Sequence, residues 1–422
     1  MKARWLSVVL VSVGLSQPAF AQESSLEVAR AAASSAPTDA QAQRNLGLAL
    51  IEAGRFPEAS AQMQKVVKLE KSSPASLYDV QRVSLAQGDY NAARRGCQEI
   101  LKASPEDVMG HVCMARAYLV WRRSSRAVEH VDAAIARDPD NYEALLVDAD
   151  TRRMEGALDA ALTAYQKVVG KFPWSAEAYL GIAQIQALRN QSKQAEEALR
   201  KALLNKPNNP DVLLELGKVT TGTEAVGFLQ RAVAARPTAV DAKLALATAQ
   251  IRAGDAKSAE PMLRAIIAKD PKNVVAATEL GAALVATGAY PEAEKLLRSS
   301  LERMPNDFDA SFALAQLFEK TGKNEDAFTQ YRNAADLKRD SAMPLLEAAR
   351  LGLSLGRPQL AGALLDRALE RAPKSAQAHA LYGDVMVARG DKAGAKDHYQ
   401  QALAGEGPVD RAHVQKALGS LK

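Results

Sequence analysis

The chain repeats one pattern of apolar, small and helix-breaking positions about every 34 residues. Prolines mark the end of most periods, with one shorter step before Pro237 and an arginine, Arg339, where a further proline is due. The prolines of this series are Pro105, Pro139, Pro173, Pro207, Pro237, Pro271, Pro305 and Pro373. An alanine lies twelve residues before each mark, and a glycine often lies five residues before that alanine, as at Gly54 and Gly88. A period of this length indicates one repeated structural unit rather than several unrelated globular domains.

The spacing within one period predicts two helices joined by a tight turn. Gly54 ends the first helix in a left-handed conformation, and Pro57 lies near the first turn of the second helix. Ala59 in the second helix allows the two backbones to approach closely, and the terminal proline ends that helix before the next period. Each unit is then a helix–turn–helix hairpin whose apolar faces become buried by stacking on its neighbours.

The residues around these turns resemble the tetratricopeptide repeat (TPR) family. The pairs Leu46-Gly47, Leu216-Gly217 and Leu280-Gly281 match its motif, as does Ala-Tyr-Pro-Glu-Ala at 289–293. The resemblance implies an all-α fold, a right-handed superhelical solenoid of about eleven helix–turn–helix repeats with capping helices. It says little about function, because the family is defined by packing rather than by chemistry.

The repeats predict a linear order of segments. We expect a cleaved signal peptide at 1–21, an N-terminal capping helix at 22–39, repeats 1–5 at 40–208, a shortened repeat 6 at 210–238, repeats 7–11 at 240–407 and a C-terminal capping helix at 408–422. Repeat 6 has only eight residues from Gly217 to Ala225, where its neighbours have twelve. Four residues make about one helical turn. Repeat 6 is therefore either a joint between the flanking arrays or a tolerated deletion that leaves the curvature unchanged.

The first residues carry the pattern of a secretory leader. Lys2 and Arg4 precede an apolar stretch at 6–15 that is too short to span a bilayer, and a small-x-small site predicts cleavage between Ala21 and Gln22. The alternative is an uncleaved N-terminal helix. We expect an exported protein, periplasmic in a Gram-negative bacterium or secreted. No later segment has 18 consecutive uncharged apolar residues, so we expect no membrane span after removal of the leader.

Composition agrees with close helix packing and argues against nucleic acid as a partner. Alanine supplies 82 of the 422 residues, whereas aromatic residues make up 5%. The formal net charge is +5, and removal of Lys2 and Arg4 with the leader lowers it to about +3. A nucleic-acid-binding protein ordinarily carries a dense basic face, and this charge is too small to indicate one.

Residue patterns for catalysis are missing from the sequence. It contains no Walker-type loop, no Gly-x-Gly-x-x-Gly, no Gly-x-Ser-x-Gly and no His-Glu-x-x-His. The five histidines are His111, His130, His379, His398 and His413. Their spacing does not suit a metal site, so we interpret them as helix-surface residues. We therefore expect a protein that is not an enzyme and that holds no cofactor or metal.

Cys97 and Cys113 are the two cysteines of the chain. They fall on neighbouring antiparallel helices of repeats 2 and 3, about equally far from the turn near Pro105. In an oxidising compartment they would form a disulfide. The alternative is two reduced cysteines that act as small buried hydrophobic residues.

The TPR resemblance also implies which positions face a ligand: the second, fifth, ninth and twelfth of each repeat. The residues read from these positions as a partner-binding surface are Arg44, Tyr78, Arg82, Arg116, Asp150, Arg153, Gln184, Lys218, Phe312, Gln316, Arg350 and Asp384. In the first three repeats, Arg44, Tyr78, Arg82 and Arg116 form a basic strip with one aromatic residue. Arginine and tyrosine are common binding anchors. We hypothesise that this strip binds an acidic or carboxylate-bearing peptide segment; the alternative is a solvated helix face.

The leading interpretation is a non-catalytic interaction scaffold of the cell envelope, which binds an extended peptide segment of another exported protein in its concave groove. One alternative is a binding module for an anionic exopolysaccharide in an export or secretion system. Another is a subunit that confers specificity on a separate enzyme.

Overall fold

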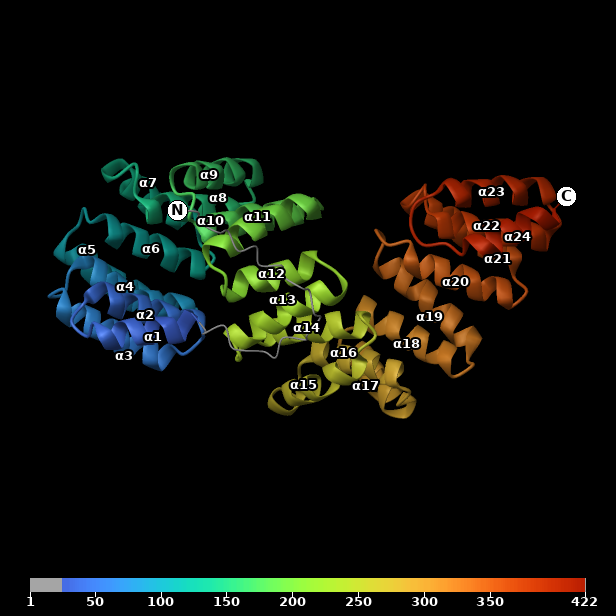
Figure 1. Cartoon of the computed structure of the whole chain (residues 1–422), viewed down its shortest axis with the longest axis horizontal. Coiled ribbons are helices and arrows are strands. Elements are labelled where there is room, and N and C mark those ends of the chain that lie inside the picture. The colour runs from blue at the N-terminus through green and yellow to red at the C-terminus, as the bar shows by residue number, and fades with distance from the viewer. Residues whose placement is uncertain (1–24, 422) are drawn as a thin grey trace, which may run out of the picture. The chain divides into compact units, whose positions relative to one another are not determined.

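A computed structural model gives the structure of residues 25–421 (Figure 1). The helices of this described part are α1 (Ser25–Ser35), α2 (Ala40–Glu52), α3 (Phe56–Leu69), α4 (Pro74–Ala86), α5 (Tyr90–Ala103), α6 (Val108–Val120), α7 (Ser124–Arg137), α8 (Tyr142–Met154), α9 (Leu158–Lys171), α10 (Ala176–Leu188), α11 (Ser192–Asn205), α12 (Pro210–Val219), α13 (Gly222–Ala235), α14 (Val240–Arg252), α15 (Ala256–Lys269), α16 (Val274–Thr287), α17 (Tyr290–Arg303), α18 (Phe308–Lys320), α19 (Asn324–Leu337), α20 (Met343–Ser354), α21 (Pro358–Arg371), α22 (Ala376–Arg389), α23 (Lys392–Ala404) and α24 (Arg411–Ser420).

Successive helices pack as hairpins, two helices to each repeat. The helices from α2 to α23 form eleven such pairs, while α1 packs on the first pair and α24 on the last. Leu26 of α1 contacts the core of the first repeat, and Val414 of α24 is fully buried in the core of the last. The predicted all-α repeat fold is confirmed.

The hairpins belong to two compact units. The N-terminal unit comprises the described part of 1–212 together with 234–237, and the C-terminal unit comprises 213–233 together with 238–421. The division passes through repeat 6, whose first helix α12 has 10 residues where α2 and α14 have 13. This division is compatible with a joint at 210–238, which stays a prediction, as do the other segment bounds. The cleavage site between Ala21 and Gln22 lies outside the described residues.

The turn inside each repeat requires one residue with a left-handed backbone conformation, that is, a positive φ. Gly288, which ends α16, has φ of 87°, a conformation that glycine adopts without steric penalty. Two equivalent positions carry other residues in the same region, Arg122 with φ of 55° and Asn190 with φ of 59°. The turn geometry is therefore kept even where the sequence departs from glycine.

The loop between repeats starts the next helix as well as ending the previous one. Two residues after several of the prolines stands a side chain that caps the following helix. The Asp107 carboxylate accepts a hydrogen bond of 2.8 Å from the Gly110 backbone N–H, and Asn141 accepts one of 3.1 Å from Ala144. Such caps satisfy backbone donors that have no partner within the helix. They fix where the first helix of each repeat begins, and so which of its side chains face the groove.

The alanine series lies where the two helices of a repeat touch. Ala59, Ala93 and Ala127 are completely buried, as are the later members of the series except Ala225, which is 3% exposed. Glycines on the first helix allow a still closer approach, since a Cβ atom at Gly281 would be 2.6 Å from the Leu297 side chain. Small residues thus set the spacing of the helices, as predicted.

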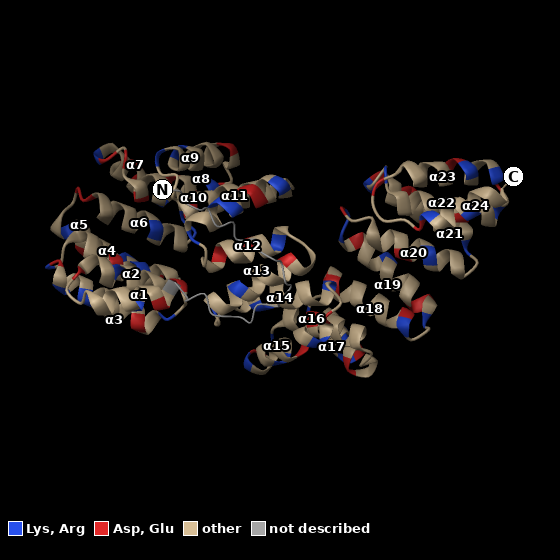
Figure 2. Cartoon of the chain, viewed as in Figure 1, with Lys and Arg blue, Asp and Glu red and all other residues tan. Residues whose placement is uncertain are grey.

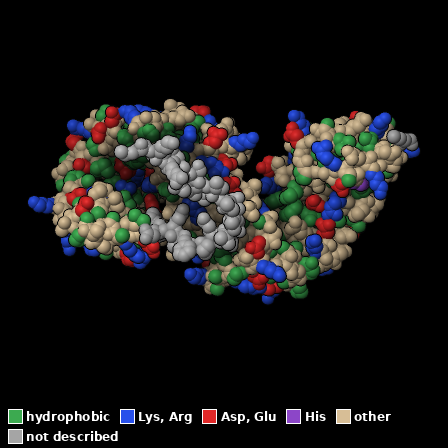
Figure 3. Space-filling model, viewed as in Figure 1, with side chains coloured by type: hydrophobic (Ala, Val, Ile, Leu, Met, Phe, Trp, Pro, Cys, Tyr) green, Lys and Arg blue, Asp and Glu red, His purple; other side chains and the backbone are tan. Residues whose placement is uncertain are grey.

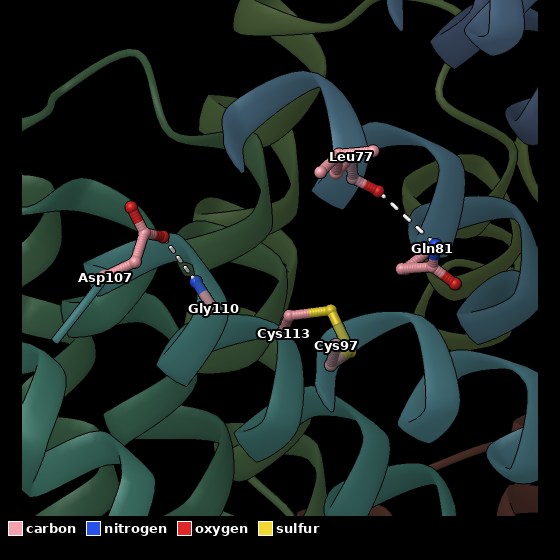
Figure 4. Close-up of a disulfide and its surroundings, with 6 residues drawn as sticks. All are labelled: Leu77, Gln81, Cys97, Asp107, Gly110 and Cys113. Atoms are coloured by element: carbon pink, nitrogen blue, oxygen red, sulfur yellow. Dashed lines mark hydrogen bonds between the residues drawn. A yellow bond between two sulfur atoms is a disulfide. The ribbon is translucent and has the colours of Figure 1, made fainter. Parts of the chain in front are cut away.

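Cys97 of α5 and Cys113 of α6 form a disulfide, with Cα atoms 5.5 Å apart (Figure 4). Both side chains are fully buried. The bond joins the second helix of repeat 2 to the first helix of repeat 3. It holds α6 in place three residues before Arg116, which reaches the groove described below.

One of the five histidines corrects our interpretation of them as helix-surface residues, whereas His111, His130 and His398 are half-buried and His413 is exposed. His379 is buried, with 7% of its surface exposed, and its Nδ1 lies 3.2 Å from Nδ1 of His398. His111 and His130 form the same pair at 3.0 Å in repeat 3. The sequence pattern could not show this, because the two rings come from facing helices. Among the described residues, no group of three or more His, Cys, Asp or Glu is placed to hold a metal ion.

None of the helices in 25–421 is long and apolar enough to cross a bilayer.

Candidate functional site

The first helices of repeats 1–5 line a groove in the N-terminal unit, which we call the N-terminal groove. It encloses about 560 Å³. The lining residues are Gln41, Leu48, Ile51, Glu52, Tyr78, Arg82, Leu85, Arg116, Tyr142, Glu143, Leu146, Asp150, Trp174, Glu177 and Lys206. Both charge signs and apolar side chains are also mixed on the face of the protein shown in Figure 3.

The apolar part of the N-terminal groove combines leucine and isoleucine with an aromatic pair. Leu48, Ile51 and Leu146 belong to α2 and α8, whereas Tyr142 and Trp174 have ring centroids 4.7 Å apart. Trp174 stays 56% exposed, an unusual state for the largest apolar side chain. The Tyr142 hydroxyl donates to Glu177 at 3.1 Å and lies 2.9 Å from the Ser175 hydroxyl, which fixes the ring. The fixed ring of Tyr142 and the exposed ring of Trp174 together form an aromatic wall that is open to a ligand.

Two arginines of the predicted basic strip share one carboxylate. Glu143 accepts from Arg116 at 2.7 Å and from Arg82 at 3.3 Å. Burial opposes ionisation of Glu143, but the charges of Arg116 and Arg82 outweigh it and hold the pKa of the carboxyl below its usual range. Arg82 also lies over the Tyr78 ring, 5.6 Å from its centroid. Figure 2 shows both acidic and basic residues on the helices of this unit.

The N-terminal groove is therefore close to electrically balanced. Its basic residues are Arg82, Arg116 and Lys206, and its acidic residues are Glu52, Glu143, Asp150 and Glu177. A partner carboxylate would have to compete with Glu143 for the arginines. Binding of an acidic peptide by the basic strip stays a prediction, which has to take this competition into account.

Arg44, the first member of the predicted strip, joins repeats instead of lining the N-terminal groove. Its guanidinium donates to Asp79 at 2.5 Å and to Glu70 at 2.6 Å. Asp79 is almost completely buried, so the ion pair links α2 and α4 inside the repeat stack.

The predicted acidic positions are anchored by tyrosines of the second helices. Asp150 accepts from the Tyr165 hydroxyl at 2.5 Å, and Arg153 donates to that same hydroxyl at 3.2 Å. Asp384 has the equivalent partner, Tyr399, at 2.7 Å. Asp384 also lies 2.9 Å from Nε2 of His413, in a depression of about 440 Å³ beside α24.

A second groove belongs to the C-terminal unit. It encloses about 660 Å³ and brings together three predicted residues, Phe312, Gln316 and Arg350. Arg350 donates to Glu319 at 2.5 Å and to Glu347 at 2.9 Å, so this arginine is also held by carboxylates of its own chain.

The remaining predicted residues have different surroundings. Gln184 and Lys218 line neither groove, and Lys218 pairs with Glu215 at 2.7 Å. Arg153 lines a smaller depression with Leu85 and Arg116.

Sequence reasoning missed much of the N-terminal groove. Tyr142 stands at the first position of α8, and Trp174 lies in the loop between α9 and α10. Glu143 was missed because its role depends on two arginines that lie 27 and 61 residues away. An available signal was the aromatic content, since Trp174 is one of only three tryptophans in the chain.

Two curated proteins resemble parts of the chain. Cellulose synthase 1 operon protein C of Komagataeibacter xylinus is 24% identical over 255 residues, covering 54% of this chain and 19% of that protein. BBSome complex member BBS4 of Bos taurus is 24% identical over 242 residues, covering 56% of this chain and 46% of that protein. The chain thus matches less than half the length of either relative.

Two solved structures are similar over most of the chain. Yeast Tom70 is 12% identical with a TM-score of 0.48, covering 90% of this chain and 94% of that one. The APC/C hetero-tetramer Cut9–Hcn1 is 13% identical with a TM-score of 0.47, covering 91% of this chain and 83% of the other. At these scores the likenesses carry no argument about function.

Sequence models of the tetratricopeptide repeat match several stretches of the chain, from the N-terminal to the C-terminal repeats. One matches residues 152–216, 222–284 and 251–317, and another matches 23–76, 114–176 and 346–411. Together they cover about three quarters of the 422 residues. With its hairpins and its buried alanine series, the chain belongs to the tetratricopeptide repeat family.

Proposed function

We propose that this protein is a non-catalytic scaffold of the bacterial cell envelope, and that its N-terminal groove binds an extended segment of another exported protein. The observation that supports this most directly is the aromatic wall of Tyr142 and Trp174 beside an apolar floor. Exposed aromatic side chains held rigid in a concave surface are typical binding anchors.

The groove offers a peptide two kinds of contact. Leu48 and Ile51, which line the groove together with Trp174, provide apolar surface for a partner side chain. The charged groups around them are already fixed by ion pairs such as Arg116–Glu143, so that few groups need to be ordered on binding. This preorganisation favours peptide recognition by shape and apolar contact over simple charge attraction.

Location in the cell envelope is supported by two independent features. Residues 1–21 have the composition of a cleavable leader. Disulfides such as Cys97–Cys113 persist in oxidising compartments outside the cytoplasm.

The experiment compares two tryptophans. Peptides that bind the purified wild-type protein are selected from a random 15-residue library, labelled with fluorescein and titrated by anisotropy. Trp174→Ala should weaken binding at least tenfold. Trp121→Ala is the matched control, because Trp121 is 48% exposed but lies outside the groove. Equal binding by wild type and Trp174→Ala, or no selected peptide at all, contradicts the proposal.

A second candidate ligand is an anionic exopolysaccharide. It is favoured by the printed name of the Komagataeibacter relative, which refers to a cellulose synthase operon, and by the tryptophan–tyrosine wall, on which sugar rings can stack. Binding of such a polymer should weaken steeply with salt and should need several arginines, whereas peptide binding should depend on one or two anchors. Titrations at 50 and 300 mM salt with alginate as the probe distinguish the two.

A further inference from the structure

Two contacts in the N-terminal unit join repeats that are far apart in the sequence. Lys206 Nζ lies 3.5 Å from a carboxylate oxygen of Glu52, 154 residues away. Arg236 Nε donates to the backbone carbonyl of Glu52 at 2.7 Å, 184 residues away. All three residues belong to the same compact unit. We call this set of contacts the latch.

The backbone contact of the latch gives a hydrogen-bond donor to the Glu52 carbonyl, which has none within its helix. Glu52 is the last residue of α2, and the carbonyls at the C-terminal end of a helix have no intrahelical donor. A cation at this end of a helix is also favoured by the helix dipole. Asp211 accepts two hydrogen bonds from Arg236, at 2.7 and 3.0 Å, and so holds the guanidinium plane against Glu52.

The side-chain contact of the latch is part of the groove wall. Glu52, Lys206 and Glu177 all line the N-terminal groove, and Lys206 bridges the other two, lying 2.6 Å from Glu177. The Lys206 and Glu52 side chains remain 38% and 31% exposed. Ion pairs with this exposure are weak and are screened by salt.

The volume enclosed by the groove limits what can lie within it. A space of about 560 Å³ has the size of a pocket for a few side chains and cannot take a folded domain. Because the latch joins the first repeat to the end of repeat 5 and the turn after α13, a segment that lies in the groove also lies beside the latch.

We propose that the latch of Glu52, Lys206 and Arg236 opens to admit an internal, extended segment of a partner protein and then closes around it. The proposal rests on the proposed function. It names the kind of partner as a polypeptide with an unfolded linker or loop between folded parts. An intact latch slows the release of such a segment, since most differences in affinity among related complexes arise from dissociation rates.

A measurement without ligand tests the latch itself. Spin labels at Ala61→Cys in α3 and Leu204→Cys in α11 report the distance across it by pulsed electron paramagnetic resonance, because the native cysteines are joined to each other. The distance distribution should broaden in Lys206→Met/Arg236→Met and in wild type at 1 M salt. Lys171→Met, which removes an ion pair to Asp140 between adjacent repeats, is the control and should leave it unchanged. An unchanged distribution in the latch variant overturns the proposal.

A kinetic measurement tests the enclosure. The probe is the library-selected peptide, either free or fused at both ends to small folded domains. Release of the fused probe should be at least tenfold slower from wild type than from Lys206→Met/Arg236→Met.

A crosslinking experiment uses Glu52→Cys/Lys206→Cys. Closing the latch with a short bismaleimide before the probe is added should slow binding of the fused probe at least 100-fold, while the free peptide still enters the groove. Capture of the fused probe at the uncrosslinked rate overturns the latch proposal alone. If the probe binds Trp174→Ala as tightly as it binds wild type, the proposed function is contradicted instead.

Discussion

Gln81 of α4 lies directly over Gly96 of α5, where a Cβ atom would be 2.1 Å from the carboxamide carbon of Gln81. Gln81 stands at the position where repeat 1 has Gly47, a small residue that lets the two helices of the hairpin approach. In repeat 2 the small residue is Gly96, which lies on the facing helix. Figure 4 shows Gln81 donating to the Leu77 carbonyl, at 3.4 Å, on its own helix.

Gly96→Ala should therefore lower the free energy of unfolding by about 1 kcal/mol, because the Gln81 carboxamide must shift to make room for the added Cβ atom. Gly170→Ala in α9 is the control, since nothing lies within 4 Å of a Cβ atom there, and it should stabilise the protein by about 0.5–1 kcal/mol. Urea unfolding measures both. Adding Gln81→Ala to Gly96→Ala should restore much of the loss, and a double variant less stable than Gly96→Ala alone would contradict this account.

Glu143→Gln should destabilise the protein by about 2 kcal/mol, because Arg116 and Arg82 lose their shared carboxylate in a partly buried site. Glu99→Gln breaks an exposed pair with Lys102 and should change stability by less than about 0.5 kcal/mol. Urea midpoints at pH 7 compare the two. Equal effects would mean that the shared carboxylate has no special role.

The same pair predicts a dependence on pH in the acid range. The pKa of Glu143 is lowered in the folded state, so its contribution is complete above the ordinary glutamate pKa of about 4.3 and is lost as the pH falls through the lowered value. The difference in unfolding free energy between wild type and Glu143→Gln should shrink from pH 6 to pH 3. A constant difference over that range would show that the ionised form is not what the arginines stabilise.

The histidine pairs predict a second pH dependence at higher pH. Burial, together with the neighbouring histidine, lowers the pKa of His130 and of His398 in the folded state. Their contribution to stability is therefore complete above the ordinary histidine pKa of about 6.5 and is lost as the pH falls toward the lowered values. The urea midpoint should fall from pH 7.5 to pH 5, and His130→Gln/His398→Gln should reduce this fall. His413→Gln, which changes a histidine outside both pairs, is the control.

Reduction of Cys97–Cys113 should cost about 3 kcal/mol in the chain-entropy model for a 16-residue separation. Unfolding with and without dithiothreitol measures this loss. In Cys97→Ala/Cys113→Ala the reductant should have no effect. Free thiols in the unreduced, denatured wild-type protein would show that the bond is not formed.

The sequence predicted the repeat hairpins because their determinants are local. Pro57, Gly54 and Ala59 act within a few residues of one another, so that spacing alone indicates helix, turn and close packing. The groove depends on side chains that meet across repeats. Arg116 and Glu143 belong to different hairpins, and Lys206 reaches Glu52 only after the small rotations of several repeats have added up. A pattern within one repeat therefore cannot predict this contact.

The paired histidines of repeats 3 and 11 have a consequence for modularity. In both repeats the first ring also lies 3.1 Å from the carbonyl of the proline in the preceding loop, Pro105 or Pro373. Repeats 3 and 11 thus contain the same contacts between two histidines and a proline carbonyl. All of these contacts lie within one hairpin and the loop that precedes it. Such a hairpin is transferable. Exchanging 105–137 with 373–405 should preserve the histidine–histidine and histidine–carbonyl contacts of both hairpins, whichever repeats they then pack against.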